Sequence, residues 1–153
     1  MDIKEQAKIY EAATQYFADT VTALSDSDLD RHQNGGWSPR QVIHHIADSE
    51  AQSYARLRRL VAEPNGSIIQ GYDEGLWAES KTLGYTELSV DNSFAVFLSV
   101  RAGSLDIIKR LTDKDLEKYG EHSESGKYTI EKWLTSYSKH PRDHADQIKS
   151  ALA

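Results

Sequence analysis

The sequence predicts an all-α protein, a four-helix bundle with long crossover loops that forms one domain over residues 1–153. Four long segments place apolar residues at intervals of three and four, the spacing of one face of a helix. Glycine and proline separate these segments, and no stretch alternates long enough to predict a strand. The length of 153 residues is close to that of one ordinary domain, and no repeat divides it.

The first predicted helix runs from about Ile3 to Leu24. Its apolar face is formed by Ile9, Ala13, Tyr16, Phe17, Thr20 and Leu24. This spacing is typical of an amphipathic helix with one side in the core.

The second predicted helix begins at Ser38-Pro39, because serine is a common N-cap and proline is favoured at the first helical position. It runs to about Val61, before the turn-forming residues 63–66. Its inward stripe consists of Ile43, Ile46, Glu50, Tyr54, Leu57 and Val61.

The segment from about Pro64 to Val90 contains four glycines and holds no regular period. We expect a long loop with one short helix around Asp73 to Ser80. Aromatic residues within the loop indicate that it packs on the bundle and covers one end of it.

The third predicted helix starts near Asp91-Asn92 and ends near Thr112, and the fourth runs from about Thr129 to Leu152. The inward residues of the third are Phe94, Phe97, Leu98, Leu105, Ile108 and Leu111, and those of the fourth are Ile130, Trp133, Leu134, Tyr137, Ile148 and Leu152. Between them we expect a short polar turn or helix and a turn at residues 122–126. The connections 64–90 and 116–127 are both long enough to cross the bundle.

The composition excludes several classes of protein. The net charge of −6 disfavours binding to nucleic acid or anionic membranes, and Arg56, Arg58 and Arg59 are better explained as the solvated face of a helix. The absence of cysteine removes disulfides, thiolate metal sites and a cysteine nucleophile. No apolar run is long enough to cross a membrane, and the first residues lack the pattern of a signal peptide. We therefore expect a cytoplasmic protein.

His140 and His144 lie four residues apart, so a helix projects both imidazoles from one face, where two rings can hold one ion. The apolar stripe of the fourth helix passes through both positions before it resumes at Ile148, which directs the rings inward. An unpaired buried donor or acceptor costs about 1–3 kcal/mol. The two rings therefore either hydrogen-bond to core tyrosines or carboxylates, or share a metal ion.

A third ligand is expected from a facing helix, because metal sites in bundles draw ligands from several helices. Each residue turns a helix by about 100°. With the stripe of the second helix centred near Ile46 and Leu57, His45 lies on its inner flank and His44 almost opposite. We expect His45 to join His140 and His144 at a divalent metal, and His44 to face solvent.

Three stretches of the sequence form a combined pattern: residues 35–49 (GGWSPRQVIHHIADS), Gly71-Tyr72-Asp73-Glu74 with Trp77, and His140 to His144 followed by Ala145, Gln147 and Ile148. Together they resemble the DinB/YfiT-like superfamily, most closely its YfiT-type branch, which is associated with metal-dependent hydrolysis and bacillithiol transfer. The resemblance extends from the second helix to the fourth.

The resemblance implies a four-helix bundle, often a homodimer, that acts on a small molecule through zinc, nickel or a similar ion. The three ligand positions fall on His45, His140 and His144. The acidic position falls on Asp48, which would hold a ligand imidazole in one tautomer or act as a base.

Pro141 departs from an ordinary helix between the paired histidines, because it lacks a backbone donor and clashes with the preceding turn. A sharp kink would weaken the pairing of His140 with His144, although a kink could also re-aim His140 toward the metal. The sequence leaves both outcomes open.

Three neutral imidazoles leave open positions on an ion, as in catalytic sites. In the reading we favour, a low-molecular-weight thiol binds as the thiolate and attacks an electrophile, while Arg40, Arg56 or Arg142 meets its carboxylates. In the alternative, water is activated to hydrolyse an amide or ester, with Asp48 or Glu50 as general base. Glu50 lies on the apolar stripe, so it is alternatively a core carboxylate paired with an arginine or tyrosine.

A non-enzymatic alternative is a stress protein that binds a small molecule through its metal. The tryptophans Trp37, Trp77 and Trp133 are expected mainly to pack in the core or anchor loops. Trp77 is the best candidate for a pocket wall, because it lies in the covering loop.

Overall fold

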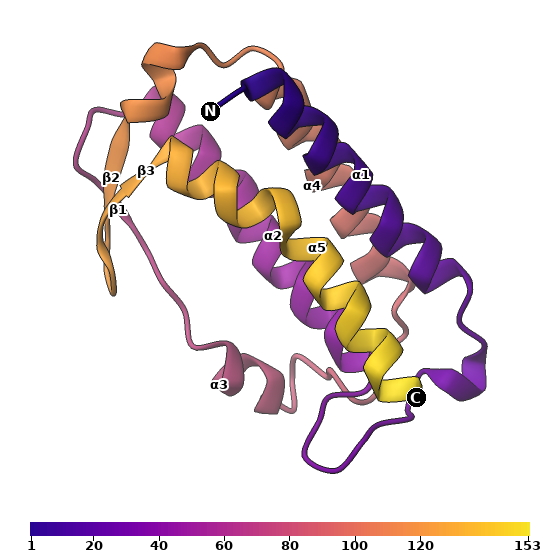
Figure 1. Ribbon diagram of the computed structural model, residues 1–153. Helices are drawn as coiled ribbons and strands as arrows, with labels where there is room; N and C mark the ends of the chain where they lie inside the picture. The colour runs from indigo at the N-terminus through magenta and orange to yellow at the C-terminus, as the bar shows by residue number, and fades with distance from the viewer.

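The computed structural model describes residues 1–153 and shows a bundle of four long helices (Figure 1). These helices are α1 (Ile3–Thr22), α2 (Pro39–Ala62), α4 (Asp91–Ile108) and α5 (Ile130–Leu152). Both α1 and α2 pack against α4 and α5, so α1 and α2 occupy opposite corners of the bundle. The predicted four-helix bundle is confirmed, and α4 ends four residues before the predicted Thr112.

Side-chain caps fix where α2 and α5 begin. Ser38 Oγ accepts a hydrogen bond from the Gln41 backbone N–H at 3.3 Å, and Gln41 Oε1 accepts one from the Ser38 N–H at 3.0 Å. Thr129 Oγ1 accepts from the Lys132 N–H at 3.1 Å. These bonds satisfy amide groups that have no partner inside the helix, which is why both predicted starts were accurate.

The connection between α2 and α4 crosses the bundle, because these neighbouring helices run in the same direction (Figure 1). The chain must return along the length of α2, whose 24 residues span about 36 Å. This connection contains β1 (Ser67–Ile69) and α3 (Glu74–Glu79), so the predicted short helix is confirmed. The connection between α4 and α5 is also long but stays at one end of the bundle, because these helices run in opposite directions (Figure 1).

A small sheet lies at the end of the bundle where α2 ends and α5 begins (Figure 1). β1 pairs in parallel with β2 (Tyr119–His122), which pairs antiparallel with β3 (Gly126–Thr129). The expectation that the chain has no strands was therefore wrong, since strands of three or four residues are too short to show alternation. Gly126 closes the hairpin with a φ of 76°, which glycine adopts without strain.

Two short 3₁₀ helices complete the connections, η1 (Asp26–Asp28) after α1 and η2 (Asp113–Glu117) after α4. The core consists of two apolar clusters along the bundle. Ile9 and Leu98, both predicted to face inward, are 40% and 38% exposed, while Tyr10 and Arg101 are buried in their place. No helix combines the length and apolarity needed to cross a membrane.

Candidate metal centre

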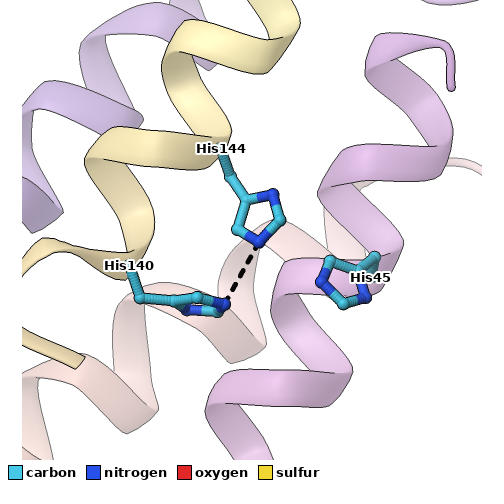
Figure 2. A group of neighbouring side chains, drawn as sticks. All are labelled: His45, His140 and His144. Carbon is cyan, nitrogen blue, oxygen red and sulfur yellow. Dashed lines mark hydrogen bonds between the residues drawn. The ribbon is translucent and has the colours of Figure 1, made fainter. Parts of the chain in front are cut away.

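Three imidazoles converge where α2 faces α5 (Figure 2). His45 comes from α2, and His140 and His144 come from α5. One nitrogen of each ring lies within 4.8 Å of the other two, and the Nε2 atoms of His140 and His144 are 3.1 Å apart. The structure thus brings together the three rings that the sequence pattern selects.

Pro141 does not interrupt α5, which is helical from Ile130 to Leu152. His140 and His144 therefore stay on one face, with ring centroids 4.6 Å apart. Because Pro141 has no N–H, the carbonyl of Tyr137 lacks its usual helical donor. Arg101 Nη1 donates to that carbonyl at 2.8 Å.

The outer nitrogens of the α5 pair each meet an acceptor. His140 Nδ1 lies 2.8 Å from Glu50 Oε1, and His144 Nδ1 lies 2.8 Å from Gln147 Oε1. A carboxylate and an amide oxygen both accept, so each Nδ1 carries the proton and each Nε2 directs a lone pair at the other ring. Two lone pairs 3.1 Å apart repel each other unless a cation lies between them. This donor set fits a metal ion.

The protonation of the rings favours the same conclusion. Burial, followed by the neighbouring imidazoles, lowers the pKa of His45 to about 3. Burial and the proximity of His140 lower the pKa of His144 to about 4. Both rings are therefore neutral near pH 7, the form that binds a metal.

The ring of His45 differs from the other two in its outer contacts. Its Nδ1 is buried without a hydrogen-bond partner, and its Nε2 lies 3.5 Å from Glu74 Oε2 on α3. Trp37 packs against it with its ring centroid 5.1 Å away. Glu74 is 63% exposed, so its carboxylate stands between the centre and solvent.

An open cavity of about 290 Å³ adjoins His45 and His144. Its wall consists of Gly35, Gly36, Trp37, His45, Glu74, His144 and Gln147. Glu74 is the one charged side chain in this lining. A larger cavity, about 900 Å³, lies around the N-terminal turns of α1 and the segment that follows α4, and its lining contains no histidine.

Glu50 is a core carboxylate, as one of the two sequence readings expected. The side chains of Glu50 and Arg101 are both 0% exposed and form an ion pair at 3.2 Å. Burial alone would raise the pKa of Glu50, but the charge of Arg101 and hydrogen bonds from His140 and Ser53 hold it below its ordinary value. Glu50 rather than Asp48 therefore orients a ligand imidazole.

Asp48 and His44 anchor the crossover connection. Asp48 accepts a hydrogen bond from the hydroxyl of Tyr85 and makes none with the three rings. His44 is only 5% exposed, with Nδ1 2.7 Å from Ser93 Oγ and Nε2 3.1 Å from the Leu88 carbonyl. The expectation that His44 faces solvent was wrong, because α4 and the connection cover that side of α2.

The three arginines predicted to meet a thiol's carboxylates are engaged elsewhere. Arg40 Nε and Nη2 donate to Asp30 at 2.7 and 3.2 Å. Arg56 donates to the Tyr137 hydroxyl at 3.2 Å and to a backbone carbonyl at 2.9 Å. Arg142 lies 4.2 Å above the ring of a tyrosine in α1. None of them lines the cavity at the histidines.

One of the three tryptophans lines the cavity, and the other two pack against neighbouring side chains. Trp77 packs on Tyr72, with centroids 4.7 Å apart, and does not line the cavity, whereas Trp37 does. Trp133 is fully buried and donates to the Ser53 carbonyl at 3.0 Å.

Sequence reasoning missed Arg101, Glu74 and Gln147. Arg101 follows the inward Phe97 by four residues, so the helical period could have placed it in the core opposite Glu50. Glu74 lies within a recognised motif, but its position beside a histidine depends on the path of the connection. Gln147 follows His144 by three residues, a spacing at which helical side chains meet.

Known proteins resemble this chain in both sequence and structure. A family model described as "DinB superfamily" matches residues 9–148. "Putative metal-dependent hydrolase OB0782" from Oceanobacillus iheyensis is 33% identical over 149 residues, which cover 97% of this chain and 84% of that protein. A protein of the same description from Bacillus mycoides is 34% identical over 134 residues, which cover 87% and 75% of the two chains.

Two solved structures share the fold. YfiT from Bacillus subtilis, called "a probable metal-dependent hydrolase with an unusual four-helix bundle topology", superimposes with a TM-score of 0.85 and 27% identity over 97% of this chain and 85% of that one. TT2238, a four-helix bundle protein, gives a TM-score of 0.67 at 19% identity over 97% and 98%, which supports the fold alone.

Proposed function

The chain belongs to the DinB superfamily, and from this premise we propose that its three histidines hold a divalent metal ion and that the centre hydrolyses an amide or ester bond in a small molecule. The observation that carries the proposal is the pair of Nε2 lone pairs of His140 and His144, 3.1 Å apart, with His45 completing the set. Imidazole donors suit zinc and nickel, the two metals we propose.

An ion on three neutral imidazoles supplies Lewis acidity and activates water near neutral pH. The hydrolytic reading needs a proton acceptor beside it. The Glu50 carboxylate already pairs with Arg101 and accepts a hydrogen bond from His140, and the Asp48 carboxylate accepts one from Tyr85. Glu74 replaces both as the proposed general base, because its carboxylate is solvent-accessible and lies 3.5 Å from His45 Nε2.

The cavity lining favours a small substrate that is uncharged or positively charged. Its volume is about 290 Å³, and Glu74 is its one charged side chain. Trp37 offers an aromatic face on which a cationic group can rest. With Arg40, Arg56 and Arg142 engaged elsewhere, a thiol with several carboxylates finds no basic partner in the lining, so we favour hydrolysis over thiol transfer.

The proposal is tested by metal analysis and by turnover. Purified protein should contain about one zinc or nickel ion per chain, and His144→Ala should lose it. A panel of small esters and amides should be hydrolysed in a metal-dependent reaction without added thiol. Turnover only with a thiol would support the transferase instead, and metal-dependent binding without turnover would support the non-enzymatic stress protein.

Glu74→Gln tests the proposed base. We expect kcat to fall by about 10²-fold or more, because the carboxylate accepts a proton in the reaction. Glu79→Gln is the matched control, since Glu79 is an exposed glutamate at the other end of α3. Equal activity in the two variants would remove Glu74 from the mechanism, and equal metal content would show that the centre itself remains intact.

A further inference from the structure

We propose that Pro141, Arg101 and Glu50 form a positioning unit for His140. The unit holds the His140 ring in one tautomer and one orientation, with Nε2 free to bind the metal ion. This inference rests on the proposed metal-binding function. The unit acts through His140, so its members are positioning residues. It links a proline inside a helix to a ring of the three-histidine cluster through one buried arginine and one buried carboxylate.

The first link is the backbone of α5. Pro141 lacks the N–H that would bond to the Tyr137 carbonyl, and Arg101 Nη1 takes that acceptor at 2.8 Å. A proline inside a helix normally leaves a carbonyl unpaired. Here the free carbonyl of Tyr137 accepts a hydrogen bond from a buried guanidinium, three residues before His140.

The second link is the fixed position of Arg101. Its Nη2 donates to the Tyr10 carbonyl at 2.8 Å, and its Nε donates to Thr14 Oγ1 at 2.8 Å. The guanidinium also lies 3.3 Å from the centroid of the Tyr10 ring. Contacts from α1 and α5 therefore hold the cation of α4 in one place, with its remaining hydrogen bonds directed at Glu50 on α2.

The third link is the set of donors around Glu50. Arg101 Nη1 lies 3.2 and 3.4 Å from its two oxygens, and Ser53 Oγ donates to Oε2 at 3.0 Å. Oε1 remains available to His140 Nδ1 at 2.8 Å. An ionised carboxylate only accepts, so this contact requires the proton on Nδ1 and leaves Nε2 free to bind the ion.

The three ligands receive unequal support from their surroundings. His140 is held by a buried anion, His144 by the amide of Gln147, and His45 Nδ1 has no partner. Carboxylate partners raise the basicity of a ligand imidazole more than neutral partners do. Loss of the Glu50 charge should therefore weaken the centre more than loss of the Gln147 amide.

The test compares the metal affinity of Glu50→Gln, Gln147→Met and the unmodified protein, by competition of zinc with a chromophoric chelator. We expect Glu50→Gln to weaken binding by about 10–100-fold, and Gln147→Met to weaken it less. Pro141→Ala should also weaken it, because the new N–H competes with Arg101 for the Tyr137 carbonyl. Thr135→Val is the control: Thr135 is exposed on α5, and its hydroxyl donates to the Glu131 carbonyl outside the unit, so the zinc affinity should stay near that of the unmodified protein.

A second measurement does not depend on metal. The ¹⁵N shifts of His140 in chelator-treated protein should show the Nδ1–H tautomer, and Glu50→Gln should populate the other one, because an amide can donate as well as accept. If Glu50→Gln does not fold, the double variant Glu50→Gln/Arg101→Met, which buries no unpaired charge, replaces it. Unchanged zinc affinity and an unchanged tautomer in a folded Glu50 variant would overturn this inference alone. Failure of the unmodified protein to bind metal, with the tautomer as expected, would overturn the proposed function and leave only the orientation of His140.

Discussion

At the scale of single residues, the pairing of Arg101 with Glu50 carries the largest electrostatic consequence. Both side chains are removed from solvent, and each depends on the other for compensation of its charge. A buried ion pair contributes little net stability compared with an apolar pair, but removal of one partner leaves an unpaired charge in the core. The pair should therefore be far more sensitive to single substitutions than its net contribution suggests.

Arg101→Met should lower the free energy of unfolding by about 3–5 kcal/mol, because Glu50 then remains buried without its cation. Urea denaturation of the chelator-treated protein measures the change. Arg59→Met is the comparison, since Arg59 is 48% exposed and its pairing with Glu63 is worth at most about 1 kcal/mol. Similar losses in both variants would show that the buried charge of Glu50 does not depend on Arg101 for its compensation.

The spacing of single residues determined how much of the site could be predicted. His140 and His144 were found from their separation of four residues, and His45 from its angle on α2. The same reasoning wrongly placed His44 in solvent, because it takes the side of α2 opposite the core to face water. In the structure, α4 and the crossover connection cover that side. Glu74 was missed as a site residue because its position depends on contacts between distant parts of the chain.

At the scale of elements, the crossover connection between α2 and α4 is held to the bundle by a few polar contacts. The Tyr85 hydroxyl donates to Asp48, and the Leu88 carbonyl accepts from Arg40 at 2.9 Å and lies 3.1 Å from His44 Nε2. The same connection carries Glu74. Its attachment therefore decides whether the proposed base stays beside the centre.

Tyr85→Phe should loosen this connection without unfolding the bundle. The loss of one hydrogen bond to a carboxylate should cost about 1.5–3 kcal/mol locally. Hydrogen exchange should accelerate in residues 70–90, while α1 and α5 keep their protection. Tyr119→Phe serves as the control, since the Tyr119 hydroxyl makes no hydrogen bond within the chain. Exchange that rises equally in all helices would contradict a local role.

The elements themselves differed in how well the sequence predicts them. The four helices were predicted because caps and apolar periods are local signals, as at Ser38 and Thr129. The sheet was missed because its strands have three or four residues and pair across the chain, Ser67 with Gly120. Local sequence patterns do not predict pairing between strands that lie far apart in the sequence.

At the scale of the whole molecule, the centre couples stability to pH. The pKa values of His45 and His144 are about 3 and about 4 in the folded chain, against an ordinary value of 6.5. As the pH falls below about 6.5, the unfolded chain binds protons at both residues while the folded chain does not. Proton uptake therefore favours the unfolded state, and stability decreases as the pH falls.

The metal-free protein should show this as a urea midpoint that decreases between pH 7 and pH 4.5. The double variant His45→Gln/His144→Gln should show a shallower decrease, because the carboxylates contribute equally to both proteins and only the histidine part is removed. Parallel curves would mean that the two rings titrate normally. Zinc should raise the midpoint of the unmodified protein at pH 7, by mass action on the folded state.

The parallel pairing of β1 with β2 has a consequence for the order of folding. β1 opens the connection that carries Glu74, and β2 follows only after α4 has been completed. The strands can meet only when more than fifty residues between them have closed into a loop, a slow, entropically opposed event. Docking of α2 on α5 closes a still longer loop, because His45 and His140 lie 95 residues apart in the sequence. In refolding kinetics, the pairing of β1 with β2 should therefore come first, and zinc capture by the three imidazoles should mark a later phase.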